Sequence, residues 1–196
     1  MTKTATIRSA NADDVEQLVD LMVISSWGGI RQAWERVRQG SETWRTRGLA
    51  EISDRDCEVG YAQFVVADLD QRVAAMALFN LIGDTTSIMT NVENAGDAAA
   101  LRLIKLSDHS LFVREIATAD WARGRGLASE LISLAERLCQ SHGQSRVTLI
   151  VNDANAPAEK LYRKLGFSSI AEEASIGHPH FPDGSRMLLM QKRTET

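Results

Sequence analysis

The feature that most constrains the fold is a glycine-rich turn between an extended segment and a helical one, within the stretch LFVREIATADWARGRGLASELISLAERL. Residues 111–118 form an apolar run typical of a strand, and after Gly126 apolar residues recur at helical spacing as far as Leu138. Gly143 then provides a natural helix end. A strand, a tight turn and a helix leave backbone N–H groups unpaired at the positive end of the helix dipole. This arrangement favours an anionic ligand, and the alternative is a plain strand-to-helix turn with solvated arginines.

Hydrophobic periodicity along the rest of the chain predicts a mixed α/β (α+β) fold. Asn11 or Asp13 is available as the N-cap of the first helix, and a polar turn at residues 69–71 indicates a hairpin. The expected order is a strand (4–9), two helices (11–26, 30–37), two strands (61–70, 71–82), an insertion (83–107) that can hold a short helix, a strand (111–118), a helix (127–142), a strand (146–151), a helix (155–165) and two strands (168–176, 185–192). We therefore expect a single domain, residues 1–196, in which helices flank both faces of a sheet of about six to seven strands.

Composition excludes several classes of function. The 196 residues are 44% hydrophobic and 24% charged with a formal net charge of −4, so we expect neither a nucleic-acid nor a membrane partner. The polar N-terminus resembles no leader, and no apolar run is long enough to span a bilayer, which indicates a cytoplasmic protein. Cys57 and Cys139 form no CxxC pair and the four histidines are scattered, so no metal site is expected.

Three kinds of anion-binding turn can be compared with the residues present. A Walker phosphate loop requires GK[ST] at the helix start, where this chain has Gly126-Leu127-Ala128. The dinucleotide fingerprint GxGxxG is matched by Gly124 and Gly126, but Ser129 occupies the third glycine position and no acidic residue ends the next strand. A nucleotide-cofactor enzyme is therefore disfavoured.

The third kind of turn comes from a family resemblance. The segment 123–128 (RGRGLA) resembles the R/Q-x-x-G-x-G/A pyrophosphate loop of the GNAT-type N-acetyltransferases, which bind acetyl-coenzyme A (acetyl-CoA). The segment 155–167 (NAPAEKLYRKLGF) resembles the N-x-x-A…Y-x-x-x-G-F block of the same family. The resemblance is strongest over residues 111–167, and the expected element order matches the family's fold.

This resemblance implies a coenzyme site and its residues. Backbone N–H groups from Arg125 to Ser129 would hold the pyrophosphate, the strand end would contact pantetheine, and the sheet would splay after this strand to admit the acyl arm. Asn155 would contact the coenzyme through its amide, although an Asn before Ala-Pro is equally a favoured N-cap. The implied coenzyme-binding residues are Ala117, Thr118, Arg123, Gly124, Arg125, Gly126, Leu127, Ala128, Ser129 and Asn155.

The resemblance also implies two catalytic residues. Tyr162 would be the general acid that protonates the departing thiolate, and the alternative is that its ring simply packs beside Leu161 and Leu165. Glu115 would be the carboxylate that receives a proton from the attacking amine, directly or through water, or that anchors the amine. The alternative for Glu115 is a structural salt bridge with Arg114. The backbone N–H groups of residues 116–118 would stabilise the developing oxyanion.

The expected function is direct transfer of acetyl from acetyl-CoA to a primary amine of a small molecule or a peptide. The alternative is a catalytically silent domain of the same fold that binds or senses acyl-CoA; because the chain keeps Tyr162 and Glu115, the enzyme is favoured. Homodimers are frequent in the family.

The acceptor side would be built by the first helices, the following loop and the last hairpin, where Trp27, Trp34, Trp44, His178, His180 and Phe181 occur. Helical spacing of Trp27, Ile30, Trp34 and Val37 favours the core for these four residues.

Overall fold

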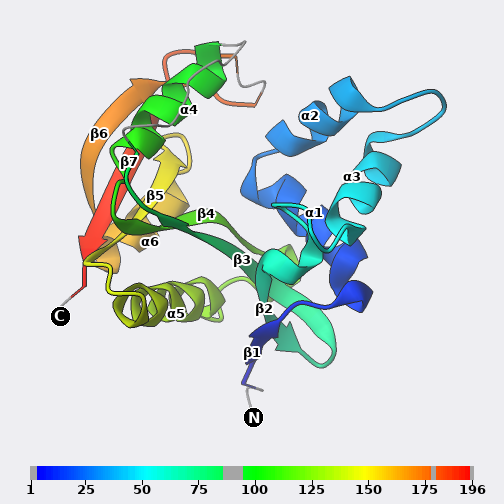
Figure 1. Ribbon diagram of the computed structural model, residues 1–196, viewed down its shortest axis with the longest axis horizontal. Helices are drawn as coiled ribbons and strands as arrows, with labels where there is room; N and C mark the ends of the chain where they lie inside the picture. Colours follow the sequence, from blue (N-terminus) through cyan, green and yellow to red (C-terminus); the bar gives the residue numbers. More distant parts are fainter. Residues whose placement is uncertain (1–3, 86–94, 178–179, 195–196) are drawn as a thin grey trace. The chain divides into compact units, whose positions relative to one another are not determined.

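The computed structural model describes residues 4–85, 95–177 and 180–194. Its strands form one seven-stranded mixed sheet in the order β1-β2-β3-β4-β5-β7-β6 (Figure 1). The strands are β1 (Thr6–Ser9), β2 (Phe64–Leu69), β3 (Arg72–Ile82), β4 (Ser110–Thr118), β5 (Arg146–Asn152), β6 (Ser168–Ala174) and β7 (Arg186–Arg193). The α-helices are α1 (Val15–Ser25), α2 (Gly29–Val37), α3 (Trp44–Ser53), α4 (Ala95–Lys105), α5 (Leu127–Ser141) and α6 (Ala156–Lys164), and the 3-10 helices are η1 (Ala12–Asp14), η2 (Tyr61–Gln63) and η3 (Asp120–Ala122).

The residues group into two compact units. The first unit combines Met1–Phe79 with Glu115–Ile132, and the second combines Asn80–Arg114 with Ser133–Thr196. The chain passes from one unit to the other within β3, within β4 and within α5. The predicted mixed sheet with flanking helices is confirmed.

In the first unit, the β2–β3 hairpin is the central element. Asp70 and Gln71 at its tip have φ of +56° and +61°, which are the backbone angles of a type I′ turn. Such a turn matches the right-handed twist of the strands it joins. The pairing slips where Ala67 faces Ala75 and Asp68 faces Val73, which leaves Ala74 as the extra residue of a β-bulge. The predicted hairpin is therefore confirmed, with its turn at the predicted residues.

The two faces of this hairpin are covered by different helices of the same unit. One face carries Phe64, Val66 and Met76, which pack with buried residues of α1, α2 and α3. The opposite face is rich in alanine, and it packs against Leu127 and Leu131 of α5. The alanines of this face are Ala67, Ala74, Ala75 and Ala77. Small side chains let the first turns of α5 approach the strands closely, so the hairpin fixes where α5 begins.

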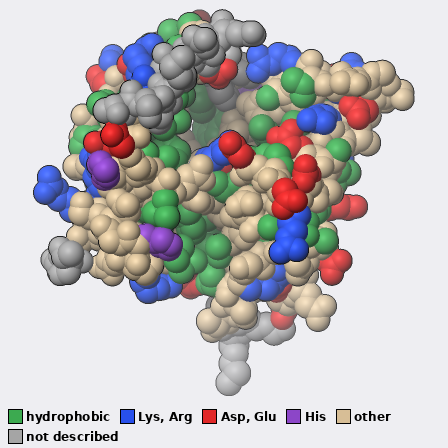
Figure 2. Space-filling view, in the orientation of Figure 1, with side chains coloured by type: hydrophobic (Ala, Val, Ile, Leu, Met, Phe, Trp, Pro, Cys, Tyr) green, Lys and Arg blue, Asp and Glu red, His purple; other side chains and the backbone are tan. Residues whose placement is uncertain are grey.

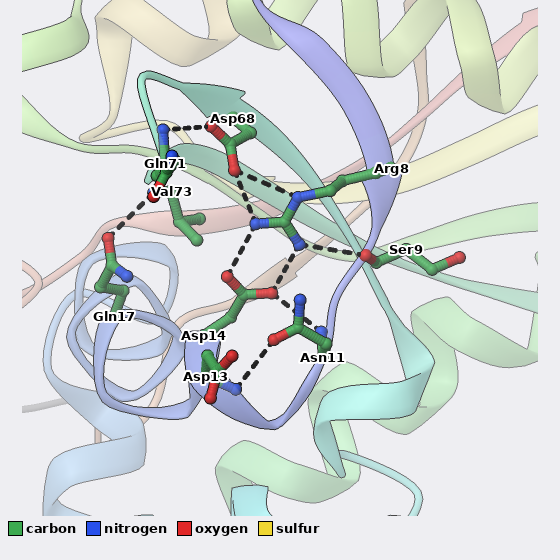
Figure 3. Close-up of polar contacts among 9 residues, drawn as sticks. All are labelled: Arg8, Ser9, Asn11, Asp13, Asp14, Gln17, Asp68, Gln71 and Val73. Atoms are coloured by element: carbon green, nitrogen blue, oxygen red, sulfur yellow. Dashed lines mark hydrogen bonds and ion pairs between the residues drawn. The ribbon is translucent and has the colours of Figure 1, made fainter.

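A cluster of charged side chains ties the N-terminal strand to this hairpin (Figure 3). The Arg8 guanidinium donates to both carboxylate oxygens of Asp14, at 2.7 and 2.9 Å, and to Asp68 Oδ2 at 2.7 Å. Asp14 also accepts a hydrogen bond from the backbone N–H of Asn11 at 2.8 Å, while Asn11 Oδ1 accepts from Asp13 N. Asn11 is thus the N-cap of η1, which leads directly into α1. The cluster joins β1, η1 and β2 through a single cation.

In the second unit, β7 pairs with β5 on one side and with β6 on the other, both antiparallel. β4 pairs with β5 in parallel through Leu111–Val113, opposite Val147–Leu149. α4 packs on β6 and β7, and α6 packs on β5. α4 confirms the short helix expected within residues 83–107, and residues 86–94 of that segment lie outside the described residues.

One helix was not expected from the sequence. Residues 44–53 form α3, capped by a reciprocal pair of hydrogen bonds between Thr43 and Thr46. Gly48 lies within this helix, although glycine is unfavourable in a helix interior. Here the glycine is required, because a Cβ on Gly48 would lie 2.7 Å from Cζ3 of the buried Trp34 ring. The ring of Trp34 also stacks on Trp44, with centroids 6.3 Å apart.

The surface carries no large field of one sign on the face drawn in Figure 2, where acidic and basic side chains are interspersed. No helix in the described part of the chain is both long enough and apolar enough to cross a membrane.

Candidate functional site

The turn between η3 and α5 lies in the first unit. Gly124 and Gly126 have φ of +74° and +82°, in the left-handed region that favours glycine. A Cβ built on either residue would meet no atom within 4 Å, so the space above this backbone is open. Glu130 N–H donates the first hydrogen bond of α5 to Gly126 O, at 3.1 Å. The N–H groups of residues 127–129 precede that bond and have no acceptor within the helix.

The two arginines of the turn are exposed. Arg123 pairs with Asp120 at 2.7 Å, but the two side chains are 64% and 80% exposed, so this ion pair contributes little stability. Both guanidiniums lie at the positive end of α5, where their charge reinforces the helix dipole. The turn therefore combines open space, N–H groups that have no acceptor within the helix and two exposed cations, a combination that suits a phosphate group.

The end of β4 leads into this turn and carries the predicted acidic residue. Ala117 is buried and packs with the core on the α1–α3 side of the hairpin, while Thr118 is half-buried. Just beyond the strand, Ala119 N donates to Ala74 O at 2.9 Å, which anchors the strand end to the bulge of β3. Glu115 is half-buried, and its Oε2 accepts a hydrogen bond from Ser25 Oγ at 2.5 Å. Ser25 is the last residue of α1.

Tyr162 lies in the second unit, on α6, and Asn155 directly precedes that helix. The last turn of α6 explains the spacing of the Y-x-x-x-G-F block. Gly166 has φ of +92°, Phe167 N donates to Tyr162 O at 3.0 Å and Gly166 N donates to Arg163 O at 3.0 Å. These bonds define a Schellman motif, and its usual hydrophobic contact is made by the rings of Tyr162 and Phe167, with centroids 5.9 Å apart. The block is therefore a helix-ending device as well as a possible source of a catalytic phenol.

Tyr162 is 7% exposed, and its burial raises the pKa of the phenol to about 12. Burial has this effect because it disfavours the charged phenolate. The hydroxyl therefore keeps its proton throughout the neutral and moderately alkaline range.

Asn155 is the N-cap of α6. Its Oδ1 accepts from Ala158 N at 3.3 Å, and the amide nitrogen takes no part in this bond. The packing alternative for Tyr162 and the capping alternative for Asn155 are thus both present in the structure. Neither excludes a second role, because the Tyr162 hydroxyl and the Asn155 NH₂ group are not the atoms that make these contacts.

The aromatic residues considered for the acceptor side divide into two kinds. Trp34 is buried and Ile30 packs against the same core, as the helical spacing predicted, and Trp44 also packs there. The prediction is wrong for Trp27 and for Val37, which is 55% exposed. Trp27 is 36% exposed and has φ of +50°, an uncommon backbone conformation for a bulky residue. His180 is exposed, and His178 lies outside the described residues.

Ser25 is the functional candidate that sequence reasoning missed. It follows the apolar positions of α1 as an ordinary polar residue at a helix end, and its partner lies 90 residues further along the chain. Among the described residues, no group of three or more His, Cys, Asp or Glu side chains could hold a metal ion.

A model of the Acetyltransferase (GNAT) family matches residues 29–167. Streptothricin acetyltransferase from Streptomyces lavendulae is 27% identical over 97 residues, which are 48% of this chain and 51% of that protein, so the match spans about half the length of this relative.

Among solved structures, the crystal structure of an acetyltransferase superposes with a TM-score of 0.66 at 19% identity, covering 97% of this chain and 100% of the other. A GNAT superfamily phosphinothricin acetyltransferase (Pat) from Sinorhizobium meliloti, solved in complex with AcCoA, superposes with a TM-score of 0.61 at 20% identity, covering 98% and 89%. These two structural matches establish the similarity of fold.

Proposed function

The chain belongs to the GNAT family of acetyltransferases, and from this premise we propose that it transfers the acetyl group of acetyl-CoA to a primary amine of a small molecule or a peptide. The main observation in support of the proposal is the backbone geometry of the turn at the start of α5. There the left-handed glycines and the N–H groups of residues 127–129 offer a cradle for a pyrophosphate. The acetyl-CoA complex of the phosphinothricin acetyltransferase supports this choice of cosubstrate.

The residues proposed to hold the coenzyme act mainly through their backbone. Gly124 and Gly126 keep side chains away from the ligand, and Arg123 and Arg125 add positive charge. Ala117 and Thr118 would lend their backbone groups to the pantetheine arm. Asn155 would donate from its amide nitrogen while its oxygen caps α6. A single domain covering residues 1–196 is part of the same proposal.

We assign to Glu115 the role of attracting the amine substrate and receiving its proton. A primary amine arrives mostly as ammonium, and it must lose a proton before its nitrogen lone pair can attack a carbonyl carbon. A carboxylate at the end of β4 attracts the ammonium and receives its proton, either directly or through a water molecule. The backbone N–H groups of residues 116–118 are the proposed donors for the negative charge that develops on the carbonyl oxygen.

We assign to Tyr162 the role of stabilising the sulfur of the leaving coenzyme A. As the new N–C bond forms and the C–S bond breaks, the sulfur gains negative charge that a hydroxyl can stabilise. The Tyr162 pKa of about 12 exceeds an ordinary thiol pKa of about 8.5, so complete proton transfer to a solvated thiolate would be uphill by about 5 kcal/mol. We therefore expect the phenol to donate a hydrogen bond to sulfur in the transition state, with its proton moving late.

The first test is ligand-dependent thermal stability. Acetyl-CoA, coenzyme A, NAD and ATP are compared at equal concentration, since a ligand that binds only the folded state raises the melting temperature. The largest increase is expected with acetyl-CoA or coenzyme A. A panel of alkylamines, arylalkylamines, polyamines, amino acids and peptides then follows, with free thiol as the readout. Stabilisation by NAD or ATP alone would contradict the proposal, and binding without thiol release would identify a silent acyl-CoA sensor.

The second test is Tyr162→Phe. The substitution keeps the ring contact with Phe167 and the helix-ending hydrogen bonds, so it removes only the hydroxyl. We expect kcat to fall by about 10²-fold with little change in the dissociation constant of acetyl-CoA. In the wild type, kcat is not expected to decline through ionisation of Tyr162 below about pH 11, because the pKa of the buried phenol is about 12. An equal loss of rate and coenzyme affinity, or no loss, would remove Tyr162 from this role.

A further inference from the structure

We propose that Ser25 is a positioning residue for the amine acceptor, because its hydroxyl holds the Glu115 carboxylate in one orientation. The inference rests on the proposed function, and it adds a residue from α1 to the acceptor side of the same site. Both residues belong to the first unit, although 90 positions separate them in the chain.

The contact has the geometry of a hydrogen bond to an ionised acceptor. Ser25 Oγ lies 2.5 Å from Glu115 Oε2, within the range of charge-assisted O–H···O⁻ bonds, and 3.0 Å from the carbonyl oxygen of Met22. A serine hydroxyl has one proton, so it donates to the nearer, charged acceptor. The Met22 carbonyl does not depend on Ser25, because it also accepts from Ser26 N at 3.2 Å and from Ser26 Oγ at 2.9 Å. Ser25 is therefore available to Glu115 without loss to the end of α1.

The backbone that follows Ser25 fixes the position of this hydroxyl. α1 ends in a Schellman motif, in which Gly28 N donates to Val23 O at 2.8 Å and Trp27 N donates to Ile24 O at 3.2 Å. Ser26 Oγ then accepts from Ile30 N at 3.1 Å and so caps the start of α2. These bonds leave the corner between α1 and α2 little freedom, and Ser25 is the last helical residue before it.

A comparison with α5 shows that the corner after α1 has a bulky residue at a backbone position that favours glycine. α5 ends in the same motif, with Gly143 at the left-handed position and φ of +68°. In α1 that position is occupied by Trp27, with φ of +50°, where glycine would be unstrained. Strained backbone of this kind is found preferentially near functional sites. The strained residue, Trp27, lies two positions after Ser25, the last residue of α1, whose hydroxyl bonds Glu115.

Fixing one carboxylate oxygen has a chemical consequence. A glutamate side chain has three rotatable torsions, and its carboxylate can turn freely unless one oxygen is held. The hydrogen bond from Ser25 to Oε2 restricts the rotation of the carboxylate and so helps to set the orientation in which Glu115 meets an ammonium group. Ser25 would thereby improve the binding and alignment of the amine, without contacting the coenzyme.

The test is a double-mutant cycle with the amine that the wild type acetylates fastest in the panel above. Ser25→Ala is expected to lower kcat/KM for that amine about 10-fold, mainly through KM, and to leave KM for acetyl-CoA unchanged. Ser25→Thr, which retains a hydroxyl, should restore most of the activity. Ser141→Ala is the matched control, because Ser141 is also the last residue of its helix and its hydroxyl bonds the carbonyl three residues earlier, at 2.9 Å from Leu138 O. It should leave the kinetics unchanged.

The decisive comparison uses Glu115→Ala, which removes the carboxylate that Ser25 holds. Because Ser25 acts through Glu115, adding Ser25→Ala to Glu115→Ala should cause no further loss of kcat/KM. A further 10-fold loss in this background, a rise in KM for acetyl-CoA, or no effect of Ser25→Ala alone would each overturn the inference. If the wild type releases no thiol with any amine, the proposed function itself fails. The Ser25 inference fails alone when the wild type is active and the cycle is additive.

Discussion

Arg8→Met provides a quantitative test of how the N-terminal strand is held to the rest of the first unit. Methionine keeps the length and much of the apolar stem of arginine but removes the guanidinium that bridges Asp14 and Asp68 (Figure 3). The Asp14 side chain is only 6% exposed. After the substitution, its carboxylate retains the backbone N–H of Asn11 as a donor but has lost both charge-assisted bonds from Arg8.

The magnitude follows from burial. Removing one partner of a buried ion pair costs about 3–5 kcal/mol, because the remaining charge stays out of water without compensation. The Arg8 side chain is itself 30% exposed, so water can reach the vacated position and the lower end of that range applies. We expect a loss of about 3 kcal/mol in the free energy of unfolding. For a chain of this length, that corresponds to a decrease of roughly 6–12 °C in melting temperature.

The assay is urea unfolding at pH 7 together with a thermal melt, with Arg38→Met as the matched control. Arg38 pairs with Glu35 at 2.6 Å, shorter than any Arg8 contact, but both side chains are well exposed. An exposed pair of this kind contributes about 0.3–0.5 kcal/mol. Comparison of the two variants therefore shows whether the burial of an ion pair or its short N–O distance determines its contribution to the free energy of unfolding. If Arg8→Met destabilises the protein no more than Arg38→Met does, the argument from burial is wrong.

The same cluster predicts how stability responds to acid. The hydrogen bonds from Arg8 are the main cause that lowers the pKa of Asp14 below its usual value. A lowered pKa in the folded state adds stability at pH values above the unfolded pKa of about 3.9, and this stability is lost as pH falls through the folded pKa. The difference in unfolding free energy between wild type and Arg8→Met should therefore be constant from pH 7 to pH 5 and shrink below about pH 4. A difference that grows on acidification would contradict this assignment.

Two glycine substitutions test different properties of the fold. Gly126→Ala should lower stability by only about 1 kcal/mol, the cost of a left-handed backbone, since its Cβ would meet no protein atom; the affinity for acetyl-CoA, measured by calorimetry, should fall at least 10-fold because the ligand is proposed to occupy that space. Unchanged affinity would place the pyrophosphate elsewhere. Gly60→Ala should be severely destabilising, with little folded protein on expression, because its Cβ would lie 1.9 Å from the backbone oxygen of Asp54; a well-folded variant would show that this loop can move.

Much of the fold could be predicted because its signals are local. Left-handed glycines end α5 and α6 at Gly143 and Gly166, and the strand, turn and helix around Gly126 follow from spacing alone. The hairpin turn at Asp70 and Gln71 was also located by its polar residues. Each of these features depends on residues within a few positions of one another, so a single sequence contains the necessary information.

Features that depend on distant partners could not be found in this way. Gly48 is unfavourable in a helix by its intrinsic propensity, and its presence within α3 is explained only by the ring of Trp34 that lies against it. Ser25 reads as a polar helix end until Glu115 is placed beside it. Asp14 reads as an ordinary acidic residue in a first helical turn, although it is the buried centre of the Arg8 cluster. In all three cases the residue type is explained by a contact that hydrophobic periodicity does not encode.

The alanine-rich face of the β2–β3 hairpin has a consequence for synthesis of the chain on the ribosome. The residues that cover the other face lie almost entirely before position 79, so α1–α3 can pack as soon as the hairpin emerges. Leu127 and Leu131, which cover the alanine-rich face, are translated about 50 residues later, after the excursion of the chain through residues 80–114. During that delay the exposed face consists of the four alanines together with Leu69 and the half-buried Val65 and Phe79. Because alanine exposes less apolar area than a larger side chain would at these four positions, the small residues that set the position of α5 in the finished protein also limit the apolar surface that the nascent chain exposes before α5 is synthesised.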